Sequence, residues 1–278
     1  MSLLSSPSSL GPYIGGHRGG LRLLQVALTS QTLQNKINKT MKLKDILTPA
    51  FPTPRPRKPL VTVEYDSDFC LWVTDGSHQP DGKPILTEAQ MRHAAEQYRL
   101  GKSKSGKTIF WMIDECGTVR DGLLGDVWVS TLLKAREPEL LRYWRVQHCL
   151  FGLHLIGPAK NTESTERVTL KAVAIVESQR SAVILSEIFP ENIWLATMSN
   201  SCFSIDLLIP LKGRKVKVFP STDETMANYC CWNDICDLAR RNYRLDIECS
   251  AYLEGQATPA QKQRHIDLVD FLFNVPQK

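Results

Sequence analysis

Two acidic positions follow stretches that predict buried strands, and this placement suits metal or acid–base chemistry. Glu177 closes the apolar run AIVE, and Asp223, with Glu224 beside it, follows the run KVKVFP. In a parallel sheet, functional groups gather at the carboxyl ends of the strands. Acids brought to one edge in this way could hold Mg²⁺ through oxygen ligands, or one could act as a general acid or base. The alternative is that they are solvated loop acids or caps of the helices that follow them.

Residues 101–108 spell a nucleotide-binding pattern, G-x-x-x-x-G-K-[ST]. A phosphate-binding loop leaves a strand and enters a helix, so that backbone N–H groups and the helix dipole face the phosphates. The patterns around this motif have the opposite order. Thr87 and Gln90 predict a capping box at the start of a helix, Gly101 is its expected C-cap, and a strand follows from Thr108. We therefore expect no ATP binding, despite the sequence GKSKSGKT.

The second half of the chain alternates between strand and helix patterns. Strands are predicted over residues 168–177, 192–197, 214–220 and 245–249, and helices over residues 178–189 and 225–243. Such alternation predicts a parallel sheet with right-handed crossovers, and therefore an α/β fold.

The first half predicts a smaller α+β region. Expected strands are Leu60–Tyr65, Cys70–Thr74, Thr108–Ile113 and Thr118–Arg120, and expected helices follow Thr87 and cover Val127–Lys134 and Pro138–Arg145.

We expect three segments. Residues 1–59, rich in Ser, Gly and Pro at the start and ending in the proline-rich linker AFPTPRPRKP, are predicted to be disordered or to include a mis-assigned start, with Met41 as an alternative first residue to Met1. Residues 60–160 form the α+β region. Residues 161–278 form the α/β domain with a C-terminal helix.

Charge and cysteine content narrow the possible environments. The net charge of +5 comes from residues 1–60, where nine Lys and Arg residues face one acid, so residues 61–278 carry a net charge of −3. None of the eight cysteines forms a C-x-x-C pair, which argues against structural zinc and, with no disulfide pattern, predicts a reducing cytoplasm. No apolar run approaches the roughly 20 residues that span a membrane, so we expect no membrane association.

Basic residues near the predicted strand ends could contact phosphate groups of DNA or RNA. Arg180 follows Glu177, and Lys212 and Arg214 precede the strand that leads to Asp223. The alternative is an ordinary solvated surface.

Seven short stretches in a fixed order resemble a known family. They are YRLG, IFWMID, LFGLHLI, AIVES, IWLA, LKGRKV and VFPSTD, and together they cover about half of the chain between Tyr98 and Trp232. The order of strand ending in VE, helix, strand, and strand ending in a D-x-D-like site resembles the Toprim domain of topoisomerases and bacterial primases. It is more closely similar to uncharacterised Toprim-like proteins of bacterial mobile elements.

This resemblance implies a Toprim-like Rossmannoid parallel sheet with helices on both faces, and a specific site. Glu177 would be the acid/base, and D-x-D would bind Mg²⁺. Here Ser221 stands at the first of those positions, Asp223 at the second and Glu224 beside them, while Met198 and Ser199 replace expected glycines. A hydroxyl in place of a carboxylate removes a charged ligand, so the Mg²⁺ site is expected to be degenerate.

The resemblance implies a primase-related protein of mobile-element DNA metabolism, with weak or absent catalysis. If the protein is active, the implied reaction is Mg²⁺-dependent nucleotidyl transfer. The alternative is a non-catalytic adaptor or regulator that uses the fold to bind a protein or nucleic acid. Implied partners are DNA or RNA and proteins of mobile-element replication or mobilisation.

Overall fold

The computed structural model describes residues 62–79, 81–142, 144–157, 171–199 and 203–273. Lys42–Lys278 forms one compact unit. The expected N-terminal segment 1–59, and the expected domain boundary at residue 160, lie outside the described residues.

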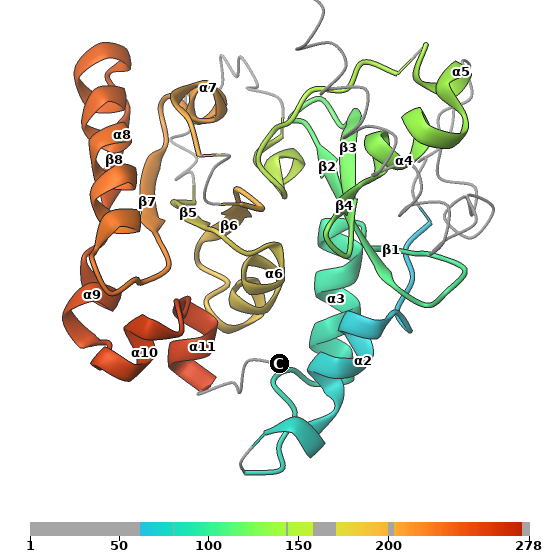
Figure 1. Cartoon of the computed structure of the whole chain (residues 1–278), viewed down its shortest axis with the longest axis horizontal. Coiled ribbons are helices and arrows are strands. Elements are labelled where there is room, and N and C mark those ends of the chain that lie inside the picture. The colour runs from blue at the N-terminus through green and yellow to red at the C-terminus, as the bar shows by residue number, and fades with distance from the viewer. Residues whose placement is uncertain (1–61, 80, 143, 158–170, 200–202, 274–278) are drawn as a thin grey trace, which may run out of the picture. The chain divides into compact units, whose positions relative to one another are not determined.

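An antiparallel sheet with short helices forms the first part of the fold (Figure 1). Its strand order is β1-β2-β3-β4. The strands are β1 (Gly101–Lys102), β2 (Thr108–Ile113), β3 (Val119–Leu124) and β4 (Val127–Trp128), and the helices are α2 (Asp68–Thr74), η2 (Gly76–His78), α3 (Glu88–Tyr98), α4 (Val129–Arg136), α5 (Pro138–Leu141) and η3 (Leu153–Ile156). All six residues of β2 are buried, so this strand forms the centre of the sheet's core.

Helix α3 confirms the predicted capping box, because Thr87 and Gln90 exchange side-chain and backbone hydrogen bonds. Its C-cap, however, is Arg99, which adopts a left-handed conformation with φ 54°, and not Gly101. Gly101 begins β1 instead. A Cβ atom there would lie 2.7 Å from the Trp111 indole nitrogen, so the close approach of two strands explains the glycine.

The predicted strands before residue 75 are wrong. Residues 62–65 are not in a strand, and residues 60 and 61 lie outside the described part of the chain. The predicted strand Cys70–Thr74 belongs to α2, which buries Phe69, Cys70 and Val73. These residues share one helical face, and a short apolar run does not distinguish a buried strand from a buried helix.

The predictions between residues 118 and 145 are correct in type but shifted at their ends. Strand β3 extends four residues beyond the expected Arg120. Val127 and Trp128 form β4, so helix α4 starts only at Val129. Helix α5 ends at Leu141, before the expected Arg145.

A four-stranded parallel sheet confirms the predicted α/β fold. Its strand order is β6-β5-β7-β8, and all three pairings are parallel. The strands are β5 (Val173–Val176), β6 (Ile193–Ala196), β7 (Lys215–Phe219) and β8 (Asp246–Cys249), and the helices between them are α6 (Gln179–Ile188), α7 (Ile205–Leu208), η5 (Ile209–Leu211) and α8 (Ala227–Tyr243).

Alternate residues of β5 enter two different hydrophobic clusters on the two faces of the sheet. Ala174 and Val176 pack in a cluster with α3 and α6, whereas Val173 and Ile175 pack in a cluster with α8. Figure 1 shows α6 and α8 on opposite sides of the strands. The first cluster also contains residues of α2 and β2, so the antiparallel and parallel sheets share one core.

Three short helices follow the parallel sheet. They are α9 (Tyr252–Gln256), α10 (Pro259–Gln263) and α11 (Leu268–Phe273). The backbone just before α11 is joined to the end of β7, because the Thr222 N–H donates to the Ile266 carbonyl at 2.9 Å. The C-terminal helices therefore reach the edge of the sheet where β5 and β7 end.

Candidate functional site at the carboxyl edge of the parallel sheet

The chain changes direction in the sheet between β5 and β7. It passes from β5 to β6 on one side, and then crosses back over β5 to β7 on the other side. Val176 pairs with Phe219, so the residues after these two strands emerge at the same edge. In open α/β sheets, ligands bind in the crevice at such a reversal. This position identifies the best candidate site.

Glu177 and Ser221 meet at this reversal. The buried Ser221 hydroxyl donates a hydrogen bond to Oε2 of the half-buried Glu177. The Glu177 carbonyl accepts a hydrogen bond from the Met198 N–H at 2.9 Å, which joins the end of β6 to the same edge. The structure therefore brings together the predicted acid/base and the first position of the D-x-D-like site.

Asp223 makes its hydrogen bonds elsewhere. Its carboxylate accepts the N–H groups of Thr225 at 2.8 Å, Ala227 at 3.1 Å and Asn228 at 2.7 Å, and the Thr225 hydroxyl at 2.6 Å. Burial by itself would raise the pKa of Asp223, but these four hydrogen bonds outweigh it and lower the pKa to about 2. Asp223 therefore caps the start of α8, while Glu224 beside it is exposed.

We expect Asp223→Ala to lower the free energy of unfolding by about 1–2 kcal/mol, as loss of a helix cap does. Because the folded-state pKa lies below the ordinary 3.8, the stabilisation is present above pH 3.8 and is lost as the pH falls through about 2. Urea unfolding at pH 7 measures the difference. Glu224→Ala, at the exposed neighbouring acid, is the matched control, and equal effects of the two substitutions would contradict the capping role.

The structure separates the three predicted phosphate-binding residues. Arg180 lies in the first turn of α6, at the same edge as Glu177, and its guanidinium is 5.9 Å from the centre of the Phe69 ring. Lys212 and Arg214 precede β7 and therefore lie at the opposite edge of the sheet. Arg214 donates to the Ile156 carbonyl at 2.8 Å, and burial lowers its pKa. Only Arg180 accompanies Glu177.

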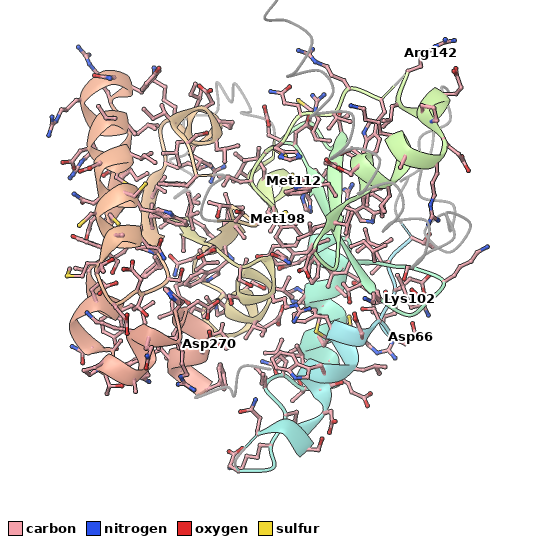
Figure 2. The ribbon with its side chains drawn as sticks, viewed as in Figure 1. Asp66, Lys102, Met112, Arg142, Met198 and Asp270 are labelled. Atoms are coloured by element: carbon pink, nitrogen blue, oxygen red, sulfur yellow. The ribbon has the colours of Figure 1, made fainter. Side chains whose placement is uncertain are left out.

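A cleft of about 710 Å³ opens at this edge. Glu177, Ser221 and Arg180 line it, but Asp223 does not. Figure 2 labels Met198, at the end of β6, and Asp270, on α11, which also line the cleft. The remaining lining residues come from α2, the β3–β4 turn, the start of α6 and the segment before α11; they are Asp68, Phe69, Trp72, Leu123, Gly125, Asp126, Ser178, Gln179, Ser181, Ile184, His265, Asp267 and Val269.

Asp267 fixes the C-terminal wall of the cleft. It accepts a hydrogen bond from the Ser181 hydroxyl in α6, and from the N–H groups of Val269 and Asp270 at 2.8 and 3.0 Å. Burial, followed by the charge of Asp270, raises the pKa of Asp267 to about 6. Sequence analysis missed this residue. The pattern D-x-x-D before the apolar run LVDFLF indicates a helix start, but it does not show which helix the start contacts.

The residues at this edge do not fit the three-carboxylate Mg²⁺ site that the family resemblance implies. Glu177 supplies one carboxylate and Ser221 a neutral hydroxyl, while the Asp223 carboxylate is directed to α8. Within the described part of the chain, no three His, Cys, Asp or Glu side chains are grouped so that they could hold a metal ion.

The G-x-x-x-x-G-K-T motif forms an antiparallel hairpin. Its first residue, Gly101, pairs with Ile109, and Lys102 pairs with Thr108. The loop between them is closed by Ser103, whose N–H donates to the Lys107 carbonyl at 2.8 Å. The motif thus connects two strands, and no helix begins at its end to direct N–H groups at a phosphate. The absence of ATP binding stays a prediction.

Comparisons with known proteins give one match. A family model described as "Domain of unknown function (DUF6371)" matches residues 83–222, which is half of the chain. The matched range includes Glu177 and Ser221, but neither α2 nor the segment before α11. No curated protein and no solved structure matches significantly. Among the described residues, no helix is both long and apolar enough to cross a membrane.

Proposed function

We propose that this chain, which belongs to the DUF6371 family of domains of unknown function, is a Toprim-like, primase-related protein of mobile-element DNA metabolism with a degenerate Mg²⁺ site. The observation that carries this proposal is the contact between Glu177 and Ser221 at the reversal point of a parallel sheet. The Toprim resemblance assigns the acid/base and the first metal-binding position to these two residues, and a functional site of this kind requires them to be adjacent.

The same contact supports weak or absent catalysis. Mg²⁺ is held through a few carboxylates and keeps several of its waters. At this edge the Asp223 carboxylate is engaged by four donors, and Ser221 provides no charge. Glu177 could still accept a proton from an attacking hydroxyl, as a general base within hydrogen-bond reach would. Any remaining activity would be nucleotidyl transfer that depends on Glu177.

A second candidate is a non-catalytic adaptor or regulator, and the charge of the cleft favours it. Five carboxylates line the cleft, whereas Arg180 is the single Lys or Arg among its lining residues in the described chain. A polyanion is repelled by such an edge unless a cation neutralises it. In this case Lys212 and Arg214, at the opposite edge, are the better candidates for contact with DNA or RNA.

Primer-synthesis and DNA-nicking assays in Mg²⁺ separate the two candidates. We expect the wild-type protein to show little or no activity in either assay, and Glu177→Gln to abolish whatever activity is present. Glu224→Gln, at an exposed acid, is the matched control and should leave it unchanged. Robust wild-type activity that Glu177→Gln removes would contradict the degenerate site. Binding of nucleic acid that is unaffected by Glu177→Gln and by chelation of Mg²⁺ would favour the adaptor.

A further inference from the structure

Two buried cysteines lie next to each other beneath helix α8. Cys236 is on the buried face of α8, and Cys249 is the last residue of β8. Both are free thiols and both belong to the same hydrophobic cluster. The Cys236 thiol is the strongest single influence on the Cys249 thiol, followed by burial, and together they raise the pKa of Cys249. The two sulfur atoms therefore face each other directly.

The local fold explains this contact. Trp232, Cys236 and Ala239 repeat at helical spacing and form the buried face of α8. In β8, Ile247 and Cys249 alternate with exposed residues and point to the same side of the sheet. Arg244, in a left-handed conformation with φ 54°, turns the helix back into the strand. The two cysteines are thus brought together by a tight helix–strand connection rather than by a distant contact.

We propose that Cys236 and Cys249 form an intramolecular disulfide when the protein meets a small-molecule disulfide such as oxidised glutathione. One cysteine thiolate attacks a glutathione sulfur, breaks its S–S bond and releases one glutathione thiolate. The second cysteine thiolate then attacks the protein sulfur of the mixed disulfide and releases the other glutathione thiolate. The protein loses two protons and two electrons, and one oxidised glutathione becomes two reduced glutathione molecules.

Such a bond would join α8 to the edge strand of the parallel sheet. It is an oxidative modification separate from the cleft, because neither cysteine lines the cleft. Since exchange requires the thiolate and burial disfavours it, the reaction should be slow at neutral pH and faster as the pH rises. Cys230 and Cys231 are exposed on the same helix, and they provide an internal comparison for thiols without such a partner.

Peptide mapping of the full chain tests this proposal. The protein is incubated with oxidised glutathione, the remaining thiols are alkylated in denaturant, and the chain is digested with trypsin. Because Arg240, Arg241 and Arg244 lie between the two cysteines, the bond should join the peptides 218–240 and 245–262. Fragmentation should place the bond at Cys236, and the melting temperature should rise by several degrees, on the order expected for a short disulfide loop.

Cys236→Ala should abolish the joined peptides, and Cys231→Ala, at an exposed cysteine of the same helix, should not. If Cys236→Ala does not fold, mapping of the wild type and of Cys231→Ala still decides the result. The proposal is overturned if Cys230 and Cys231 become glutathionylated while Cys236 and Cys249 remain alkylated as free thiols. It is equally overturned if the bond joins Cys249 to Cys230 or Cys231.

Discussion

Tyr98→Ala is expected to lower the free energy of unfolding by about 3–5 kcal/mol, as removal of a fully buried aromatic side chain does. Tyr98 ends α3 and is completely buried. Its ring stacks on Phe151 with ring centres 5.1 Å apart, and its hydroxyl donates to the Trp194 carbonyl at 2.7 Å. This side chain thus connects the helix before the antiparallel sheet to a strand of the parallel sheet.

Urea unfolding of Tyr98→Ala, Tyr98→Phe and Tyr243→Ala separates the contributions. Tyr98→Phe keeps the ring but removes the hydroxyl, and should cost about 1–2 kcal/mol because a buried carbonyl loses its donor. Tyr243, which is half exposed on α8, is the matched control, and its replacement should cost less than about 1 kcal/mol. Similar losses for Tyr98→Ala and Tyr243→Ala would show that Tyr98 does not join the two sheets.

Asp267→Asn is expected to stabilise the protein at high pH. The pKa of Asp267 rises from 3.8 to about 6 on folding, so its contribution to stability is fully present below pH 3.8 and is lost as the pH rises through about 6. This shift of about two units corresponds to about 3 kcal/mol. Asn carries no charge and caps a helix as well as Asp does, so it keeps the N–H contacts of Val269 and Asp270.

The difference between wild type and Asp267→Asn should therefore be close to 3 kcal/mol at pH 8 and should disappear near pH 4. Urea unfolding across this range measures it. Asp126→Asn, at an exposed acid that also lines the cleft, is the control and should change stability little at any pH. A destabilised Asp267→Asn at pH 8 would mean that the ionised carboxylate is needed by Ser181 and by the start of α11.

The parallel sheet could be predicted because its strands and helices have distinct patterns. The run VAIV is buried on both faces and appears as a continuous apolar segment, whereas α8 repeats Trp232, Cys236 and Ala239 at helical spacing. The segment CLWVT had no such distinction. It is rich in residues that favour strands, yet it belongs to α2, because tertiary packing of Phe69 and Val73 decides the conformation of a short apolar run.

The candidate site could be predicted only where strand order determines it. Glu177 and Ser221 each follow a parallel strand, so their meeting follows from the pattern alone. The direction of the Asp223 side chain did not, because a carboxylate before a helix can either face the sheet edge or accept the N–H groups of that helix. Asp267 and Ser181 are 86 residues apart, and no periodicity connects them.

Calorimetric titration of Mg²⁺ into the wild-type protein and into Ser221→Asp tests the degenerate site most directly. The wild type should bind Mg²⁺ weakly, since Glu177 is the single carboxylate at the contact. Ser221→Asp should bind at least about tenfold more tightly, and it should unfold more easily without metal because two adjacent carboxylates repel each other. Ser204→Asp, at an exposed serine away from the cleft, is the control. Unchanged Mg²⁺ affinity and unchanged metal-free stability in Ser221→Asp would contradict the proposal that this edge is a former metal site.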